Sequence, residues 1–384
     1  MAEKLTVYAY NVFFGDAILV EVPDAGTKRY ILIDVGNVLI DKGSEDKPLL
    51  DAIDDIIVRT KGKIDLYVMT HEHMDHVQGL AYAANQGRTL SVDTVWLTAS
   101  AAPDYYDKNK HPKAREKKLA LQEAVATFQA VLGAAVPQDL RGMLAVNAGA
   151  TGVLGLNARS TKECVQHIRE MRPGNLHYVY RGYAARGSNP FKEAKLRILA
   201  PEEDTSDYYG RAKAQLTPGA QGPSEAGGRP LPLSGIDGGA FYDLVESMDR
   251  GFAESLLSID RAENNTSVVI ELEWRGRRLL FTGDAEQRSW RMMADKAGLQ
   301  PVDLLKVGHH GSGNATPPVP ILDLILPPAR KRSAVAVLST CTDVYNDVPS
   351  PAVRSALESR TRTIHETASV DPGKPVKVSL SAGR

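Results

Sequence analysis

The sequence has very little cysteine, no long hydrophobic run and almost no net charge. Its 384 residues include two cysteines, Cys164 and Cys341, and carry a formal net charge of −1 at pH 7. Two distant cysteines argue against a disulfide scaffold and a thiolate zinc site, and they fit a reducing cytosol. The longest apolar runs are about one strand long, whereas a membrane span needs roughly 20 apolar residues. A dedicated nucleic-acid binder is usually more basic, so such binding would need a local patch.

The composition is that of an ordinary globular protein. Hydrophobic residues make up 43% and charged residues 24% of the chain. Residues 1–7 show no basic region followed by an apolar stretch, so we expect no secretory signal and a cytoplasmic protein. At this length one large domain or two modest ones are possible. We predict a single domain over residues 1–384.

Strand-like and helix-like segments alternate near both ends of the chain. Residues 99–194 are mixed and mostly helical in pattern, which predicts an insertion, and residues 216–240 are dense in glycine and proline, which predicts a loop or lid. Predicted strands cover 5–12, 17–22, 30–35, 64–69, 92–97, 196–199, 266–273, 278–281, 302–307, 334–338 and 376–380. Predicted helices cover 48–58, 113–132, 241–257, 285–297 and 352–359.

Residues 70–76 form the densest group of metal-ligand side chains and hold three of the nine histidines. They follow an apolar run typical of a buried strand, so they lie where a strand ends in a loop. Imidazole and carboxylate are ligands that zinc, manganese and iron favour. His71 and His73 can face one metal while Asp75 and His76 face a second. An exposed polar loop is the alternative, and the later motifs weigh against it.

Three further apolar runs end in side chains that suit a metal. One precedes Asp34, a second precedes Asp284, and a third precedes His309 and His310. A carboxylate buried at a strand end is costly unless it is paired or binds a metal. Asp284 can bridge two cations, since each oxygen can take one, and His310 can add a nitrogen to the second. Asp34 is predicted to orient a ligand histidine, with a helix or turn cap as the alternative.

In their order, these motifs resemble the metallo-β-lactamase superfamily. Its His-x-His-x-Asp-His signature is matched by residues 71–76. The closer resemblance is to the soluble domain of ComEC-type competence proteins, and it covers residues 4–98 and 195–382. The segments that carry it are 14–19, 31–36, 70–79, 264–269, 281–284, 305–312 and 349–351.

The resemblance implies an α/β fold, a four-layer αββα sandwich with the metal site at the sheet edges and a mostly helical insertion. It implies two Zn²⁺ or Mn²⁺ ions per chain. The second site is expected to be the more secure of the two. The implied ligands are His71 and His73 for the first metal, Asp75, His76 and His310 for the second, and Asp284 as the bridge.

His309 is the weaker candidate ligand of the two adjacent histidines. The family's last ligand histidine is commonly followed by one residue and then a small polar one, as His310 is followed by Gly311 and Ser312. Asn265 and Ser267, which open a later strand, are predicted to support the ligands. Ser312 and Lys306 are predicted to lie beside the site.

One departure from the superfamily concerns the first metal. Most members have a further histidine between the cluster and the bridging aspartate, but no histidine occurs between His177 and His309. Asn264, Asn265 and Ser267 occupy that stretch, as they do in the ComEC-type branch. The first metal is then held by fewer protein ligands plus water, or His177 fills the gap.

The resemblance implies a metal-dependent hydrolase, and the association of the ComEC-type branch with DNA degradation favours a phosphodiesterase or nuclease. A metal-bound hydroxide would attack phosphorus, with Asp75, Asp284 and His310 as the principal catalytic residues. Lys306 or Ser312 could assist near the leaving group, or Lys306 could face the core. A lactone, thioester or β-lactam hydrolase is the alternative reaction, and a non-catalytic scaffold or regulatory module is the third hypothesis.

A basic run at residues 108–118 follows Tyr105 and Tyr106. A solvated helix face is the favoured interpretation. The alternative is a surface that tracks a single nucleic-acid strand and stacks its bases on the two aromatic rings.

Overall fold

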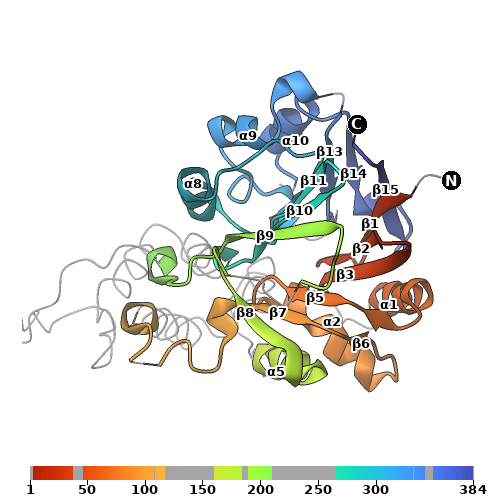
Figure 1. Cartoon of the computed structure of the whole chain (residues 1–384), viewed down its shortest axis with the longest axis vertical. Helices are drawn as coiled ribbons and strands as arrows, with labels where there is room; N and C mark the ends of the chain where they lie inside the picture. Colours follow the sequence, from red (N-terminus) through yellow and green to blue (C-terminus); the bar gives the residue numbers. More distant parts are fainter. Residues whose placement is uncertain are drawn as a thin grey trace, which may run out of the picture.

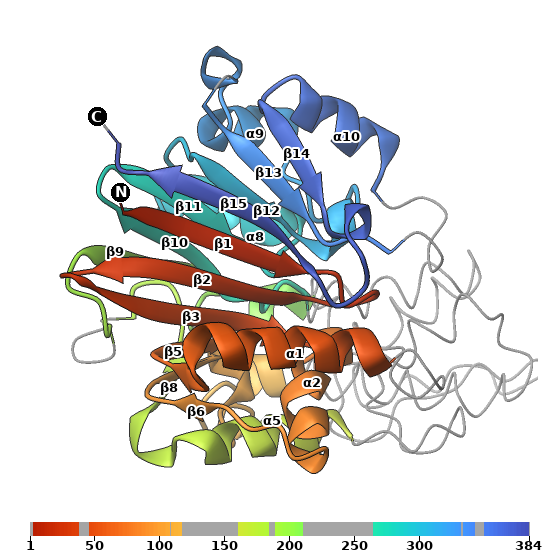
Figure 2. The ribbon, with the colours of Figure 1, turned by 90° about the vertical axis from the view of Figure 1, so that its right-hand side faces the viewer.

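Two β-sheets face each other, and helices cover the outer side of each, as Figures 1 and 2 show. The predicted four-layer αββα sandwich is confirmed. No helix within the described part of the chain is long and apolar enough to cross a membrane. The computed structural model describes residues 3–37, 46–107, 109–116, 160–183, 189–209, 264–331, 333–341 and 349–383.

The first sheet is antiparallel on one side and parallel on the other. Its strand order is β15-β1-β2-β3-β5-β7-β8, and the strands from β3 to β8 run parallel. The strands are β1 (Lys4–Tyr10), β2 (Ala17–Asp24), β3 (Thr27–Val35), β5 (Leu66–Met69), β7 (Val95–Thr98), β8 (Leu176–Val179) and β15 (Pro375–Ser381). The covering helices are α1 (Lys47–Thr60), α2 (Met74–Asn85) and α5 (Thr161–Met171).

The second sheet repeats this mixture of antiparallel and parallel pairing. Its order is β14-β13-β12-β11-β10-β9, and β11 to β14 run parallel. The strands are β9 (Ala194–Ala200), β10 (Val269–Trp274), β11 (Arg277–Phe281), β12 (Leu304–Val307), β13 (Val335–Leu338) and β14 (Thr363–Glu366). The covering helices are α8 (Gln287–Lys296), α9 (Val319–Ile325) and α10 (Pro351–Glu358). A separate pair joins β4 (Lys63–Ile64) to β6 (Ser91–Val92).

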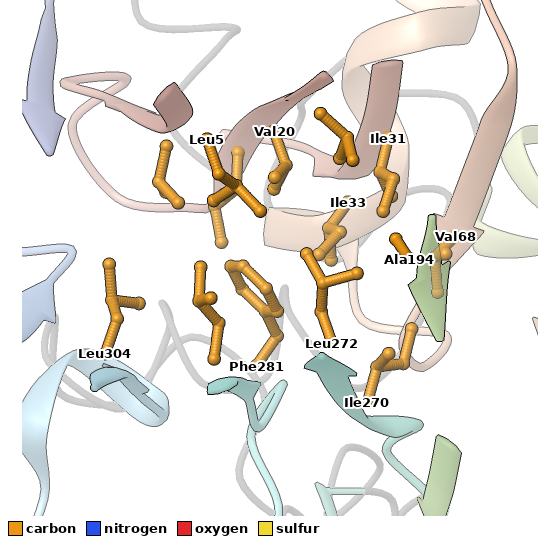
Figure 3. Packing of buried hydrophobic residues seen from close by; sticks show 14 of the residues in the cluster. Leu5, Val20, Ile31, Ile33, Val68, Ala194, Ile270, Leu272, Phe281 and Leu304 are labelled. Atoms are coloured by element: carbon orange, nitrogen blue, oxygen red, sulfur yellow. The ribbon is translucent and has the colours of Figure 1, made fainter. Parts of the chain in front are cut away.

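The apolar core between the sheets follows from the two-residue period of the strands. Ile31 and Ile33 of β3 face the second sheet, whereas Leu32 between them packs under the helices. Figure 3 shows Ile33 meeting Leu272 and Phe281 across the interface. A strand buried on both faces therefore reads as a continuous apolar run.

Most predicted strands and helices agree with the structure where the chain is described, with boundaries moved by one to three residues. The predicted strands 64–69 and 92–97 are each divided, because β4 and β6 leave the first sheet and pair with each other. Helix α2 was not predicted, because the ligand cluster gave residues 74–76 a loop-like composition, and α9 was not predicted either. Strands β8 and β14, which are short and hold half-exposed polar residues, were also not predicted. Residues 216–240 and 241–257, predicted as a loop and a helix, lie outside the described residues.

The predicted insertion, residues 99–194, is described only in part. Its described portion contains α5, which packs on α2, and β8, which pairs with β7 at the edge of the first sheet. The helix predicted for 113–132 is described only as far as residue 116. The described end of this range therefore contributes to the first sheet and its helix layer.

Candidate metal centre

The candidate site lies where parallel strands of both sheets end. Residues 70–73 follow β5, and α2 begins directly after them at Met74. Asp284 follows β11, and His310 follows β12. The carboxyl ends of parallel strands are where open α/β sheets commonly place a ligand site. Each sheet therefore contributes side chains to one shared cluster.

The cluster brings three predicted ligands within binding range of one ion. Ligand atoms of His71, His76 and Asp284 all lie within 4.8 Å of one another, and all three side chains are buried. The Nε2 atom of His76 is 3.3 Å from Asp284 Oδ2 and 3.5 Å from Asp75 Oδ2. His310 Nε2 is 3.7 Å from the same Asp75 oxygen. Residues from both predicted metal sites thus meet in one group.

Hydrogen bonds to Nδ1 fix how two of these histidines present their other nitrogen. Asp34 Oδ2 lies 2.8 Å from His76 Nδ1 and also accepts the hydroxyl hydrogen of Thr70 at 2.6 Å. Thr70 has given its hydrogen to Asp34, so its oxygen accepts from His71 Nδ1 at 3.0 Å. In the neutral form of each ring, Nε2 of His71 and His76 then keeps its lone pair for an ion, and neither atom has a hydrogen-bond partner. Metal-binding histidines are typically held this way.

The second sheet orients His310 by the same chemistry. Its Nδ1 lies 3.1 Å from the main-chain oxygen of Ser339, which can only accept, so Nδ1 carries the hydrogen. Its Nε2 is buried and has no hydrogen-bond partner. Asp75 Oδ1 is also buried without one. Buried polar atoms normally find partners, and these atoms fit the donor set of a divalent cation.

The carboxylates of the cluster favour a positive charge between them. Burial opposes a charge on His76, but Asp75, Asp284 and Asp34 outweigh it and raise the pKa of His76 well above its ordinary value. Burial and the neighbouring His76 and His73 lower the pKa of His71 well below its ordinary value. Burial raises the pKa of Asp284, yet His76 reverses this and holds it well below the usual range. The centre thus combines ionised carboxylates with a neutral imidazole.

Asp34 reaches His76 through a β-bulge. In the pairing of β2 with β3, Ala17 lies opposite Val35 and Ile18 opposite Ile33, which leaves Asp34 as the extra residue. Its φ of 51° is left-handed, an unusual conformation for a residue other than glycine. Bulges next to active sites re-aim side chains. The extra residue turns Asp34 to meet Thr70 and His76.

The start of α2 is packed so closely that only glycine fits beside it. A Cβ atom on Gly36 would lie 2.2 Å from the main-chain carbon of Asp75 and 2.4 Å from the nitrogen of His76. A Cβ on Gly15 would lie 2.6 Å from the oxygen of Asp75. The two loops after β1 and β3 therefore press directly on the peptide that carries two candidate ligands.

The turn after β12 holds His309 and His310 in a left-handed conformation, with φ values of 45° and 54°. Such residues cost energy unless their surroundings hold them. The His309 nitrogen donates to Asp284 Oδ1 at 2.8 Å, and the Gly311 oxygen accepts from the Ser350 nitrogen at 3.1 Å. The turn thus points His310 into the cluster.

The remaining predicted ligands take different positions. The ring of His73 packs edge-on against His71, with centroids 4.5 Å apart, and lies outside the three-residue group described above. His309 turns its Nδ1 toward Glu286 Oε1 at 3.8 Å, and it belongs to neither potential metal group among the described residues. His177 uses both ring nitrogens, with Tyr183 at 2.7 Å and Asn175 at 2.8 Å, which assigns it a structural role.

The four predicted supporting residues also divide. Ser267 Oγ accepts from the Asp284 nitrogen at 3.1 Å and so contacts the site. Asn265 instead accepts from the nitrogen and hydroxyl of Ser289 in α8. Ser312 accepts from the Ala315 nitrogen within its own turn. Lys306 is buried and pairs with Asp16 at 3.0 Å, which places it in the core.

Two contacts that orient the candidate ligands were not predicted from the sequence. Thr70 joins His71 to Asp34, and its position directly before the histidine cluster is a signal that was available. The Ser339 oxygen is a main-chain atom, so no residue type marks it. Tyr105, proposed as a stacking surface, is buried, and its hydroxyl contacts Glu203 and Thr205.

Comparison with known proteins gives fold-level likenesses. No protein-family model matches the chain, and no curated protein sequence matches it. Among solved structures it is similar to the metallo-beta-lactamase fold protein YhfI from Bacillus subtilis, with 7% identity, a TM-score of 0.38, and coverage of 97% of this chain and 99% of that one. A mutant of CmlA beta-hydroxylase aligns at 10% identity and a TM-score of 0.38, over 99% of this chain and 54% of that one. The chain therefore spans about half of the second protein. The αββα assignment rests on the sheets and helices themselves.

Proposed function

We propose that this chain is a metal-dependent hydrolase of the metallo-β-lactamase superfamily that acts on phosphodiesters, as a phosphodiesterase or nuclease. One observation carries the metal dependence. Three buried Nε2 atoms, on His71, His76 and His310, have no hydrogen-bond partner and converge with Asp75 and Asp284. Buried polar atoms normally have partners, so an ion held between these side chains explains the convergence of three such atoms with two carboxylates.

The donor set favours zinc or manganese. Imidazole nitrogen and carboxylate oxygen suit both ions, and neither cysteine joins the candidate group. His71, His76 and Asp284 would hold one ion, and Asp75 with His310 would contribute to a second. A bound divalent cation would lower the pKa of water and neutralise charge that develops on a substrate oxygen.

The residues around the ligands would supply orientation. Asp34 and Thr70 hold the rings of His76 and His71 from behind, and the Ser339 oxygen holds His310. The His309 nitrogen and Ser267 hydroxyl fix both ends of the Asp284 residue. Removing a supporting contact of this kind typically lowers metal affinity or activity by roughly tenfold to a hundredfold.

The choice of phosphodiesters comes from the ComEC-type motif order, because a fold does not fix a substrate. Nucleic acid or a nucleotide is the proposed substrate class. The buried orientation of Tyr105 means that this ring takes no part in base stacking in the described conformation. Substrate contacts would then come from other residues near the strand ends.

The test measures metal content first and turnover second. Purified protein is stripped with a chelator, reloaded with Zn²⁺ or Mn²⁺, and its metal stoichiometry determined. Each form is then assayed on labelled single-stranded DNA, cyclic dinucleotides and a chromogenic phosphodiester. We expect metal-dependent cleavage of at least one phosphodiester, and we expect Asp284→Asn to slow it roughly a hundredfold to a thousandfold.

Two other outcomes would replace the proposal. Turnover of a lactone, thioester or β-lactam with no phosphodiester cleavage would assign the same centre to a different bond. Absence of bound metal at physiological zinc and manganese would favour a non-catalytic module.

A further inference from the structure

Lys306 is a buried cation among the apolar residues between the two sheets. It lies in register with Phe281 of β11 and Val337 of β13, and both belong to the inter-sheet core. Side chains alternate along a strand, and Leu304 faces the first sheet, so Lys306 faces it too. Only 3% of Lys306 is exposed. An ammonium group at such a position is costly unless it is paired.

Its partner comes from the opposite sheet. Lys306 Nζ lies 3.0 Å from Oδ2 of Asp16, which precedes β2, and it also donates to the Val307 oxygen at 3.1 Å. Burial alone would raise the pKa of Asp16, but Lys306 reverses this and holds it below its ordinary value. Asp16, Asp34 and His76 form a second buried group with ligand atoms within 4.8 Å. The Lys306 ammonium already supplies a positive charge there.

Stability gives little reason for this ion pair. Replacing a buried pair with apolar residues of similar size is often neutral or stabilising, because both charges lose their hydration. The contacts of the pair suggest a different role. Each partner is bonded to a segment that carries one of the site carboxylates.

On the first sheet, Asp16 is tied to Asp75. The Asp16 nitrogen donates to the Asp75 oxygen at 3.1 Å, and the Asp16 oxygen accepts from the Gly36 nitrogen at 3.0 Å. The absence of a side chain on Gly15 and Gly36 permits this close packing. The residue whose side chain pairs with Lys306 therefore supports the main chain of Asp75 directly.

On the second sheet, Lys306 is tied to the Asp284 turn. Its main-chain oxygen accepts from the Thr282 hydroxyl at 3.0 Å. A Cβ on the nearby Gly308 would lie 2.3 Å from the Gly283 oxygen, so these two turns are in direct contact. One residue thus reaches the Asp284 turn through its main chain and the Asp75 support through its side chain.

We propose that Lys306 and Asp16 form a positioning pair that sets the location of Asp75 relative to Asp284 across the two sheets. This inference rests on the proposed metal centre. The pair links the sheets at the site end of the sandwich, where two carboxylates must flank His76 at 3.3 and 3.5 Å. Lys306 serves the site from the core and takes no part at the leaving group.

The test separates metal affinity from folding. Asp16→Asn/Lys306→Met removes both charges together and keeps both side chains near their original size. Folding is followed by fluorescence during denaturant unfolding, since Trp96, Trp274 and Trp290 are all buried. Metal binding is followed by titrating the chelated protein with Co²⁺ and recording its visible absorption spectrum. The control is Arg29→Met/Asp65→Asn, at the ends of β3 and β5 away from the site, which removes the 2.8 Å ion pair between these residues and the 2.9 Å pair of Arg29 with Asp24.

We expect the double variant to unfold at a denaturant concentration close to that of wild type and to bind Co²⁺ roughly tenfold to a hundredfold more weakly, with an altered spectrum. The control should keep wild-type affinity and spectrum. Wild-type affinity in a folded Asp16→Asn/Lys306→Met protein would overturn the inference.

A second variant decides the matter if the double variant does not fold. Lys306→Arg keeps the charge but places a longer, wider group against Asp16. We expect weaker Co²⁺ binding despite the retained ion pair, and unchanged binding would overturn the inference. Wild-type protein that binds no metal at all would instead refute the proposed function, so the two failures are distinguishable.

Discussion

The two sheets place side chains at the same site by different local means. The first sheet uses a helix start, in which Asp75 and His76 lie in the first turn of α2 against Gly36. The second sheet uses a left-handed turn, in which His309 and His310 are held by Asp284 and neighbouring main-chain groups. A helix start presents charged side chains at little cost, because its positive dipole end favours a carboxylate. The left-handed turn must be held against its own strain.

The two sheets are alike in that each supports its own ligands. The first sheet supplies both the histidines and their support, Asp34 and Thr70. The second sheet supplies Asp284 and His310, whose supports come from its own strand ends. The two sets meet at His76, which lies between Asp75 and Asp284.

The largest expected effect comes from removing the shared carboxylate. Asp284→Asn should lower kcat/KM by roughly a hundredfold to a thousandfold, because a neutral amide no longer neutralises the charge of a bound cation. His71→Ala should lower kcat/KM by less, since it removes one ligand that the first sheet alone supplies. Steady-state kinetics with the reloaded metal compares the two. A larger loss for His71→Ala would show that the first sheet dominates the centre.

The next effect tests the packing of the two halves. Gly36→Ala places a Cβ 2.2 Å from the Asp75 carbon, and Gly308→Ala places one 2.3 Å from the Gly283 oxygen. Each should lower the free energy of unfolding by about 3 kcal/mol, since main-chain atoms must move. Gly174→Ala is the control, because a Cβ there meets nothing within 4 Å. Denaturant unfolding measures all three. An unchanged free energy of unfolding in Gly36→Ala would show that the main chain at the start of α2 can move to make room.

A smaller effect is expected from the support behind the histidines. Asp34→Asn can no longer accept from Thr70 and His76 as a carboxylate, so metal affinity should fall roughly tenfold to a hundredfold. Thr70→Val removes one hydroxyl and keeps the side-chain shape, so it should lower metal affinity by less. Competitive Zn²⁺ titration with a chromophoric chelator gives both affinities. An equal loss of metal affinity in the two variants would show that Thr70 carries the support of the histidines.

The smallest effect concerns the contact that joins the halves away from the site. Trp274 of β10 donates its indole hydrogen to the Pro23 oxygen of β2 at 2.8 Å. Trp274→Phe should lower the free energy of unfolding by about 1 kcal/mol, the usual worth of one hydrogen bond. Metal affinity should stay at the wild-type value. A coupled loss of affinity would mean that the whole interface, and not its site end, positions the ligands.

Much of this fold could be predicted because its signals are local. The apolar runs of β3, β5, β11 and β12 are each followed by a polar side chain, and those strand ends do meet. The start of α2 was missed because the same residues carry chemistry and helical structure. His309 and His310 are adjacent in sequence, yet only the left-handed turn shows that they face different neighbours.

The sequence by itself determined most strand positions and the residues that supply the candidate ligands, since strand periodicity and ligand chemistry are set by residue types, and its motif order implied the sandwich by resemblance. Tertiary structure decided how the ligands group, which nitrogen each histidine presents, and which residue Lys306 contacts. Those properties depend on main-chain oxygens, a bulge at Asp34 and an ion pair between residues 290 positions apart. Contacts of that kind are set by packing across the two sheets, and no local pattern records them.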